Sequence, residues 1–250
     1  MVILVVRYVT VTGHRGAPRL APENTIPSFL KAIELGVDFV ELDVRLTKDG
    51  IPVVIHDDKV DRTTNGSGPV SLYTLEKLKT LDAGSWFSSE FRGIRIPTLC
   101  EALEAIDGKV FVEIELKEDG AVEPVVEIVE ELGLVRKVLV SSFQLDRLKR
   151  AKKICPKIPL VWIVEKLNEE VVDAAIEVGV NRLDVLFSEL TFDKVRAIHF
   201  RGLTVNGWVI DKLSDAELAV EMDVDNVTTN RPEIIVKLYE SLIPLPEEFI

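Results

Sequence analysis

The sequence predicts a single (β/α)8 barrel of the α/β class, with a small insertion after the second strand region. Short β-branched runs alternate with stretches of helical spacing along the chain. About eight such pairs occupy 250 residues, which is the usual size of a closed barrel. An open doubly wound sheet is the alternative, but no Gly-x-Gly-x-x-Gly sequence follows an early strand.

The expected strands are short runs rich in Val, Ile and Leu. They are residues 9–13, 37–44, 110–116, 138–141, 159–164, 180–185, 203–210 and 226–229. The apolar opening, residues 1–11, is interpreted as a strand and not a signal peptide, because it is short and has no basic segment before its apolar residues.

The expected helices lie between these strands, where apolar residues recur at helical spacing. They are residues 26–35, 122–132, 144–152, 168–178, 192–198, 214–221 and 232–239. Gly36, Gly133 and Gly179 directly follow three of them, at the position where glycine commonly ends a helix.

Residues 57–98 interrupt the alternation of strands and helices. This segment is rich in Gly, Ser, Thr and Asp and has one short helical stretch, residues 75–81. It predicts a small inserted subdomain, a lid or cap near the site. Because no linker-like composition borders it, residues 1–250 are treated as one domain.

Composition excludes several classes of protein. Thirty Lys and Arg against 42 Asp and Glu give a net charge of −12, which argues against a nucleic-acid partner. No apolar run approaches the ~20 residues that cross a bilayer, so stable membrane insertion is not expected. Cys100 and Cys155 fit no disulfide or zinc pattern, which favours a cytoplasmic location. Oligomeric state is not predicted, because the apolar residues 242–245 suit either a partner surface or a tail on the barrel.

Acidic residues lie near the ends of two expected strands. Side chains alternate along a strand, so Glu41 and Asp43 share one face, and Glu113, Glu115 and Lys117 repeat the pattern. Strands of a covered parallel sheet are normally apolar, and barrel active sites lie at strand C-terminal ends. Without thiol ligands, Glu41, Asp43 and Glu115 predict a hard divalent cation, Mg²⁺ first, with Ca²⁺ or Mn²⁺ as alternatives. The opposing interpretation is three separate solvated carboxylates.

Two of the three histidines lie at strand exits beside these carboxylates. His14 follows the first strand, and His56 ends the run 51–55. Two imidazoles suit an acid and a base at a phosphorus centre, with Arg15 and Lys117 placed to hold anionic oxygens. A structural role for each histidine, and an ion pair of Lys117 with a nearby glutamate, are the alternatives.

Several short strings stand in a fixed order along the chain. They are His14-Arg15-Gly16, Pro22-Glu23-Asn24-Thr25, Val40-Glu41-Leu42-Asp43-Val44, Leu46-Thr47-Lys48-Asp49-Gly50, Val53-Val54-Ile55-His56-Asp57 and Asp61-Arg62-Thr63-Thr64. In order and spacing they resemble the glycerophosphodiester phosphodiesterase family. The later strings Ile96-Pro97-Thr98-Leu99, Glu113-Ile114-Glu115-Leu116-Lys117 and Ser141-Ser142-Phe143 extend the resemblance over nearly the whole chain.

The resemblance implies a (β/α)8 barrel and metal-dependent hydrolysis of glycerophosphodiesters to sn-glycerol 3-phosphate and an alcohol. Carried over position by position, it implies metal ligands Glu41, Asp43 and Glu115, a catalytic pair His14 and His56, and phosphate contacts from Arg15 and Lys117. The segment 57–98 corresponds to the family's inserted subdomain. Which alcohol is released is not predicted.

Two positions differ from the family pattern, and the alignment of a third has to be chosen. The family commonly has Asn where Glu113 stands, so an extra carboxylate is expected to alter the charge or preference of the metal site. Asn230 replaces Asp in a string resembling Thr-Asp-Arg-Pro. Residues 208–211, and not 204–206, match the family's Trp-Thr-Val-Asn, which makes Trp208 a wall of the substrate pocket, with a core aromatic as the alternative.

Two other functions compete with this interpretation. A lysophospholipase D-type lipid phosphodiesterase would admit an acyl chain, and Trp86, Phe87 and Phe91 would form its apolar entrance unless they only pack the insertion onto the barrel. A non-catalytic phosphate-ligand binder is the second, and the complete set of site residues argues against it.

In the hydrolase, one histidine deprotonates the nucleophile, which is water or the glycerol 2-hydroxyl, and the other protonates the leaving alcohol. His14 is preferred as the base and His56 as the acid.

Overall fold

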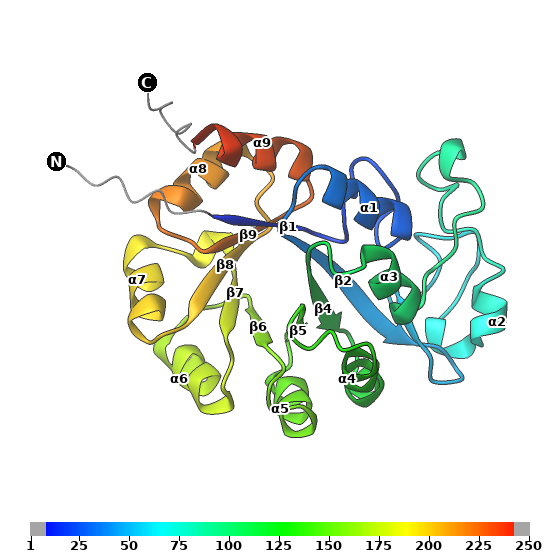
Figure 1. Ribbon diagram of the computed structural model, residues 1–250, viewed down its shortest axis with the longest axis horizontal. Coiled ribbons are helices and arrows are strands. Elements are labelled where there is room, and N and C mark those ends of the chain that lie inside the picture. The colour runs from blue at the N-terminus through cyan, green and yellow to red at the C-terminus, as the bar shows by residue number, and fades with distance from the viewer. Residues whose placement is uncertain (1–8, 243–250) are drawn as a thin grey trace.

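The computed structural model describes residues 9–242, which form a closed barrel of eight parallel strands (Figure 1). The strands are β1 (Thr10–Gly13), β2 (Phe39–Leu46), β4 (Phe111–Leu116), β5 (Val138–Ser142), β6 (Leu160–Val164), β7 (Arg182–Leu186), β8 (Thr204–Trp208) and β9 (Asn226–Thr229). β1 pairs with both β2 and β9, and these pairings close the barrel. The predicted fold class is confirmed. The opening segment expected as a strand is described only from residue 9 onward.

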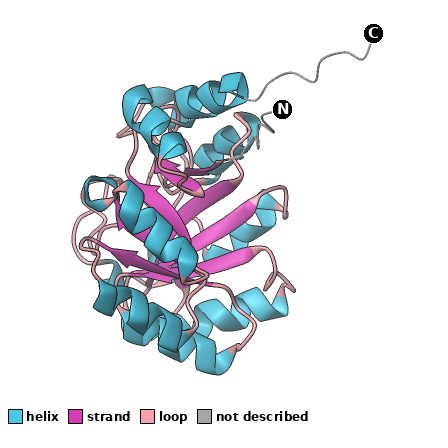
Figure 2. Cartoon of the chain, turned by 90° about the vertical axis from the view of Figure 1, so that its left-hand side faces the viewer, coloured by secondary structure: helices cyan, strands magenta, loops and turns pink. Residues whose placement is uncertain are grey.

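Helices surround the strands on the outside of the barrel (Figure 2). They are α1 (Ile26–Glu34), α3 (Leu99–Ile106), α4 (Val122–Glu131), α5 (Leu145–Ile154), α6 (Glu169–Val178), α7 (Phe192–Phe200), α8 (Leu213–Glu221) and α9 (Pro232–Leu242). All seven predicted helices are present, and the three glycines expected to end helices have positive φ. None of the helices among residues 9–242 is long and apolar enough to span a membrane.

Helix α3 was missing from the sequence prediction, although its start carries a recognisable signal. The Thr98 hydroxyl accepts a hydrogen bond from the backbone N–H of Glu101, and the Glu101 carboxylate accepts one from the backbone N–H of Thr98. This reciprocal arrangement is a capping box, and its sequence signature is Thr-x-x-Glu before an apolar run.

A short antiparallel strand brings His56 to the C-terminal ends of the barrel strands. β3 (Pro52–Val54) pairs with β2, with Val44 opposite Val54. The strand therefore ends at Val54 and not at His56. The backbone N–H of Ile55 donates to the carbonyl of Asp43 at 2.9 Å, so the chain returns beside the C-terminal end of β2.

The segment after β3 has its own small apolar cluster and lies to one side of the barrel (Figure 1). It contains α2 (Leu75–Leu78) and the 3₁₀ turns η1 (Val70–Leu72) and η2 (Ser89–Phe91). The buried residues of the cluster are Val53, Ile55, Val60, Val70, Leu78, Ala83 and Ile96. We propose on this basis that residues 57–98 form an inserted subdomain within one barrel domain.

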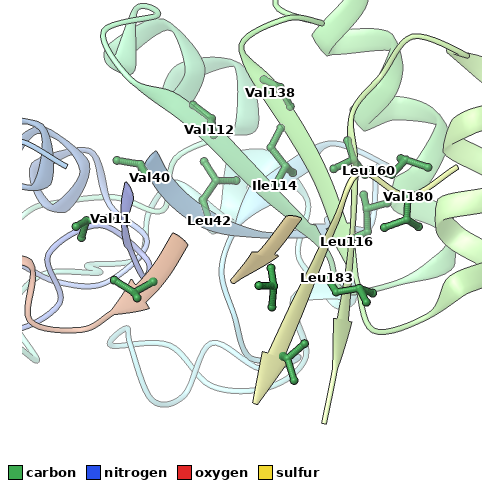
Figure 3. Packing of buried hydrophobic residues seen from close by; sticks show 14 of the residues in the cluster. Val11, Val40, Leu42, Val112, Ile114, Leu116, Val138, Leu160, Val180 and Leu183 are labelled. Atoms are coloured by element: carbon green, nitrogen blue, oxygen red, sulfur yellow. The ribbon is translucent and has the colours of Figure 1, made fainter. Parts of the chain in front are cut away.

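The two faces of the barrel strands have different chemistry. Val40 and Leu42 alternate with Glu41 and Asp43 along β2, and both apolar side chains are fully buried in the core. Figure 3 shows these residues beside their apolar counterparts on β4, among them Ile114. The apolar face holds the helices, and the opposite face directs polar side chains into the barrel.

We predict that Leu42→Ala lowers the free energy of unfolding by about 2–5 kcal/mol, because it leaves a cavity in this core. Leu72→Ala is the matched control, since Leu72 is 68% exposed whereas Leu42 is 0% exposed. Urea unfolding followed by circular dichroism measures both changes. Equal losses in the two variants would contradict the packing described here.

Candidate active site

A cavity of about 140 Å³ lies where the C-terminal ends of the barrel strands meet. It brings together residues that are far apart in the sequence, from the end of β1 to β9. Seven of the eight residues singled out from the sequence line it: His14, Arg15, Glu41, His56, Glu115, Lys117 and Trp208. The eighth, Asp43, contacts both Arg15 and Lys117.

Strand pairing gathers the three carboxylates. Asp43 lies opposite Glu115 in the ladder between β2 and β4, and Glu41 lies two residues earlier on β2, opposite Glu113. One oxygen from each of the three carboxylates lies within 4.8 Å of the others. Oε1 of Glu41 and Oδ1 of Asp43 are buried and accept no hydrogen bond from the described residues. Two such oxygens in a cluster of three hard carboxylate ligands fit a divalent cation, although Nζ of Lys117 lies 3.3 Å from Oδ1 of Asp43.

Electrostatics inside the cavity is unfavourable for three anions without such a cation. Burial, and then the neighbouring Asp43, raise the pKa of Glu115 to about 7. Burial and the charges of Asp43 and Glu115 also raise the pKa of Glu41. Burial alone would raise the pKa of Asp43, but Lys117 and Arg15 hold it below its ordinary value. Asp43 is therefore the permanent anion of the group.

Arg15 is fixed at the cavity by three contacts. Its Nε lies 3.2 Å from Oδ2 of Asp43, its Nη1 donates to Glu23 at 2.8 Å, and its backbone N–H donates to Glu41 at 2.8 Å. Its own φ is positive, at 55°, and the next residue must be glycine: a Cβ on Gly16 would lie 2.5 Å from Oγ of Ser28. The tight turn after β1 thus sets the position of the guanidinium.

Lys117 reaches the same place from the end of β4. Its Nζ lies 2.7 Å from Oε1 of Glu115 and 3.3 Å from Oδ1 of Asp43. The ion pair with Glu115, given above as the alternative for Lys117, is present, yet Lys117 also lines the cavity. Arg15 and Lys117 together give this acidic cavity two cations able to bind an anionic group.

The two histidines have different partners. Nδ1 of His14 lies 2.7 Å from the amide oxygen of Asn230, and burial together with Arg15 lowers the pKa of His14 to about 4. Nδ1 of His56 lies 2.7 Å from a carboxylate oxygen of Asp57. Burial lowers the pKa of His56 too, while the charge of Asp43 opposes that shift.

A chain of ion pairs links the insertion to the turn after β1. Arg62 donates to Asp57 at 2.7 Å and to both oxygens of Glu23 at 2.8 Å, and Glu23 in turn accepts from Arg15. Glu23 and Arg62 occur in two of the strings quoted from the sequence, but no role was assigned to them. They connect the surroundings of His56 with those of Arg15.

Beneath the cavity, Arg182 crosses the inside of the barrel. It donates to Glu113 on β4, which is not a neighbour of β7, and to Asp184 at 2.7 Å. The extra carboxylate expected to alter the metal site is therefore paired with a buried guanidinium. Arg182 and Asp184 were not identified from the sequence, although they show the same spacing of two that identified Glu41 and Asp43.

Aromatic residues form one wall of the cavity. The indole N–H of Trp208 donates to the carbonyl of Asp184 at 3.1 Å, and its ring meets that of Phe143 edge to face at 5.7 Å. Trp208 thus lies at the cavity, as the alignment of residues 208–211 predicts. The sequence pattern alone indicates no role for Phe143.

The remaining candidates lie elsewhere. Trp86 and Phe91 each pack edge to face on Phe87, and none of the three lines this cavity. His199, to which no role was assigned, bonds to Asp225 at 2.7 Å and does not line it either. Of the apolar residues 242–245, positions 243–245 lie outside the described residues.

Sequence comparison finds relatives that match most of the chain. A glycerophosphodiester phosphodiesterase of Caldanaerobacter subterraneus is 38% identical over 234 residues, covering 91% of this chain and 96% of the relative. One of Bacillus subtilis is 33% identical and covers 93% of this chain and 86% of its own length.

Solved structures agree with this comparison. An Oleispira antarctica phosphodiesterase, in complex with the product sn-glycerol-3-phosphate, superposes with a TM-score of 0.88 at 32% identity, covering 93% of this chain and 97% of that one. A Thermotoga maritima glycerophosphodiester phosphodiesterase gives 0.79 at 30% identity, covering 93% and 99%. The family model for glycerophosphoryl diester phosphodiesterases matches residues 14–234. The chain belongs to the glycerophosphoryl diester phosphodiesterase family.

Proposed function

We propose that the protein hydrolyses glycerophosphodiesters to sn-glycerol 3-phosphate and an alcohol. One observation carries the proposal: a single cavity combines a carboxylate triad, two cationic side chains and two histidines held by separate partners. The product bound to the Oleispira antarctica relative is sn-glycerol-3-phosphate, which supports the same substrate class here.

Glu41, Asp43 and Glu115 would hold the divalent cation. When bound, such an ion stabilises negative charge on a phosphate oxygen and makes a bound water or hydroxyl more acidic. Mg²⁺ is the preferred ion, with Ca²⁺ or Mn²⁺ as alternatives, because carboxylate ligands suit all three.

Arg15 and Lys117 bind the remaining anionic oxygens and orient the diester. The nucleophile, water or the glycerol 2-hydroxyl, loses its proton to Nε2 of His14. A new bond forms from that oxygen to phosphorus, the bond to the alcohol breaks, and His56 protonates the departing oxygen. If the 2-hydroxyl attacks, water opens the cyclic phosphate in a second step.

The partners of the histidines support this division of roles. His14 rests against a neutral amide, and its low pKa keeps it unprotonated near neutral pH. Burial lowers the pKa of His56 as well, but the charge of Asp43 and the contact with the Asp57 carboxylate oppose that shift and favour the protonated form needed in an acid. Trp208 and Phe143 offer an apolar surface to the carbon atoms of the substrate.

An acylated substrate has no specific support, since the aromatic residues of the insertion do not line the cavity. That alternative and the non-catalytic binder stay as competing hypotheses. The same assay separates all three.

We expect the protein to release glycerol 3-phosphate from glycerophosphocholine or glycerophosphoethanolamine. EDTA should abolish this activity, and addition of Mg²⁺, Mn²⁺ or Ca²⁺ should restore it. A coupled assay of glycerol 3-phosphate measures this. Turnover only of lysophosphatidylcholine would favour the lipid phosphodiesterase, and phosphate-ester binding without turnover would favour the binder. Either result would overturn the proposal.

We expect His14→Ala and His56→Ala each to reduce kcat/KM by about 10²–10⁴-fold, because each removes a proton-transfer group. Thermal melting should remain cooperative in both variants. His199→Ala is the matched control and should keep wild-type turnover, since His199 lies away from the cavity. Wild-type activity in either of the first two variants would refute the assignment.

A further inference from the structure

The hydrogen bonds behind His14 fix the orientation of the Asn230 side chain. The amide nitrogen of Asn230 donates to Oδ2 of Asp211 at 2.9 Å, and its backbone N–H donates to Oδ1 at 2.7 Å. The hydroxyl of Thr229 also donates to Oδ1, at 3.1 Å. An ionised carboxylate only accepts hydrogen bonds, so the amide nitrogen has to face Asp211. The amide oxygen therefore faces His14.

This orientation determines which nitrogen of His14 carries a proton. The amide oxygen of Asn230 only accepts, and it lies 2.7 Å from Nδ1 of His14. Nδ1 has to be the donor, and in the neutral imidazole Nε2 is then unprotonated. The direction of donation runs without a break from His14 through Asn230 to Asp211.

We propose that Asn230, oriented by Asp211, is a positioning residue that holds His14 as the Nδ1-protonated tautomer, with Nε2 free to accept a proton. The proposal rests on the proposed function for its consequence in catalysis. The tautomer itself is a property of the protein without substrate, so it can be tested separately from turnover.

An amide orients the imidazole without placing a negative charge beside it. The charge of Asp211 lies one side chain further away, whereas His56 contacts its carboxylate directly. A carboxylate in contact with a histidine commonly raises the pKa of that histidine by about 1 unit or more. The histidine would then stay protonated, and unable to act as a base, up to a higher pH. The amide thus extends the pH range in which His14 accepts a proton.

Other charged groups also act on His14. They come from the turn after β1, from the ends of β2 and β4 and from the segment after β3: Arg15, Glu23, Glu41, Asp43, His56, Glu115 and Lys117. An informative variant leaves all of these groups in place and changes only the hydrogen-bond partner of Nδ1 of His14.

Exchanging the two partners does this. In Asp211→Asn with Asn230→Asp, the new amide at 211 accepts from the backbone N–H of residue 230 and donates to the new carboxylate, which accepts from Nδ1 of His14. Every hydrogen bond and the net charge are retained, while the carboxylate moves into contact with His14. Asn168→Asp is the control for the same chemical change, because Asn168 caps α6 away from the cavity and Asp caps equally well.

The first measurement is ¹⁵N NMR of the imidazoles in the wild-type protein, with His14→Gln identifying the His14 signals among the three histidines of the chain. We expect Nδ1 of His14 to be protonated and Nε2 unprotonated at neutral pH. The opposite tautomer would overturn the proposal, and this test requires no turnover and no folded double variant.

The second measurement follows the pKa of His14 by NMR and the pH profile of kcat/KM. In the exchanged variant we expect both the pKa and the acidic limb to move up by about 1 pH unit, because a base with a higher pKa stays protonated to higher pH. Asn168→Asp should leave both unchanged. A folded exchanged variant with the wild-type pKa of His14 would overturn the proposal, whereas a shifted pKa with an unchanged pH profile would contradict the role of His14 as base.

Discussion

Side chains that alternate along the strands of a closed barrel have to point either outward to the helices or inward, and the inward side chains of β2, β4 and β7 include charged residues. Among the described residues, five carboxylates lie inside the barrel and its cavity: Glu41, Asp43, Glu113, Glu115 and Asp184. Arg15, Lys117 and Arg182 are the cations that contact them. Five carboxylates against three cations leave a formal excess of two negative charges in this set, and Glu23, which also contacts Arg15, lies outside it. A divalent cation would offset the excess. Buried charge of one sign is too costly to remain unpaired, so the arrangement of the site follows from this balance.

The same balance separates the two histidines. The permanent cation Arg15 and burial keep His14 neutral, and its partner is an amide. His56 lies at the rim, where Asp57 and Arg62 connect it to Glu23. The insertion therefore contributes Asp57 and Arg62, which connect His56 with Glu23, although none of its described residues lines the cavity. Burial lowers the pKa of both histidines, but their hydrogen-bond partners differ: an amide for His14 and a carboxylate for His56.

The sequence was sufficient for the barrel and for the residues whose chemistry contrasts with their strand. Glu41 and Glu115 interrupt apolar runs and were recognised for that reason. Asn230 and Arg62 could not be assigned from spacing, because their contacts join segments far apart in the chain. Arg182 and Asp184 were within reach of the same strand rule. A cytoplasmic location and the absence of a nucleic-acid partner stay predictions from composition.

The most direct test of this charge balance is calorimetric titration of the metal-free protein with Mg²⁺, Mn²⁺ and Ca²⁺. We expect one ion bound per chain, with affinity falling as the pH drops below about 7, because protons then compete for Glu115. Glu115→Gln should lose this binding, while Glu169→Gln, at the exposed start of α6, should keep it. No bound ion, or equal binding by Glu115→Gln and the wild-type protein, would contradict a divalent-cation site at these carboxylates.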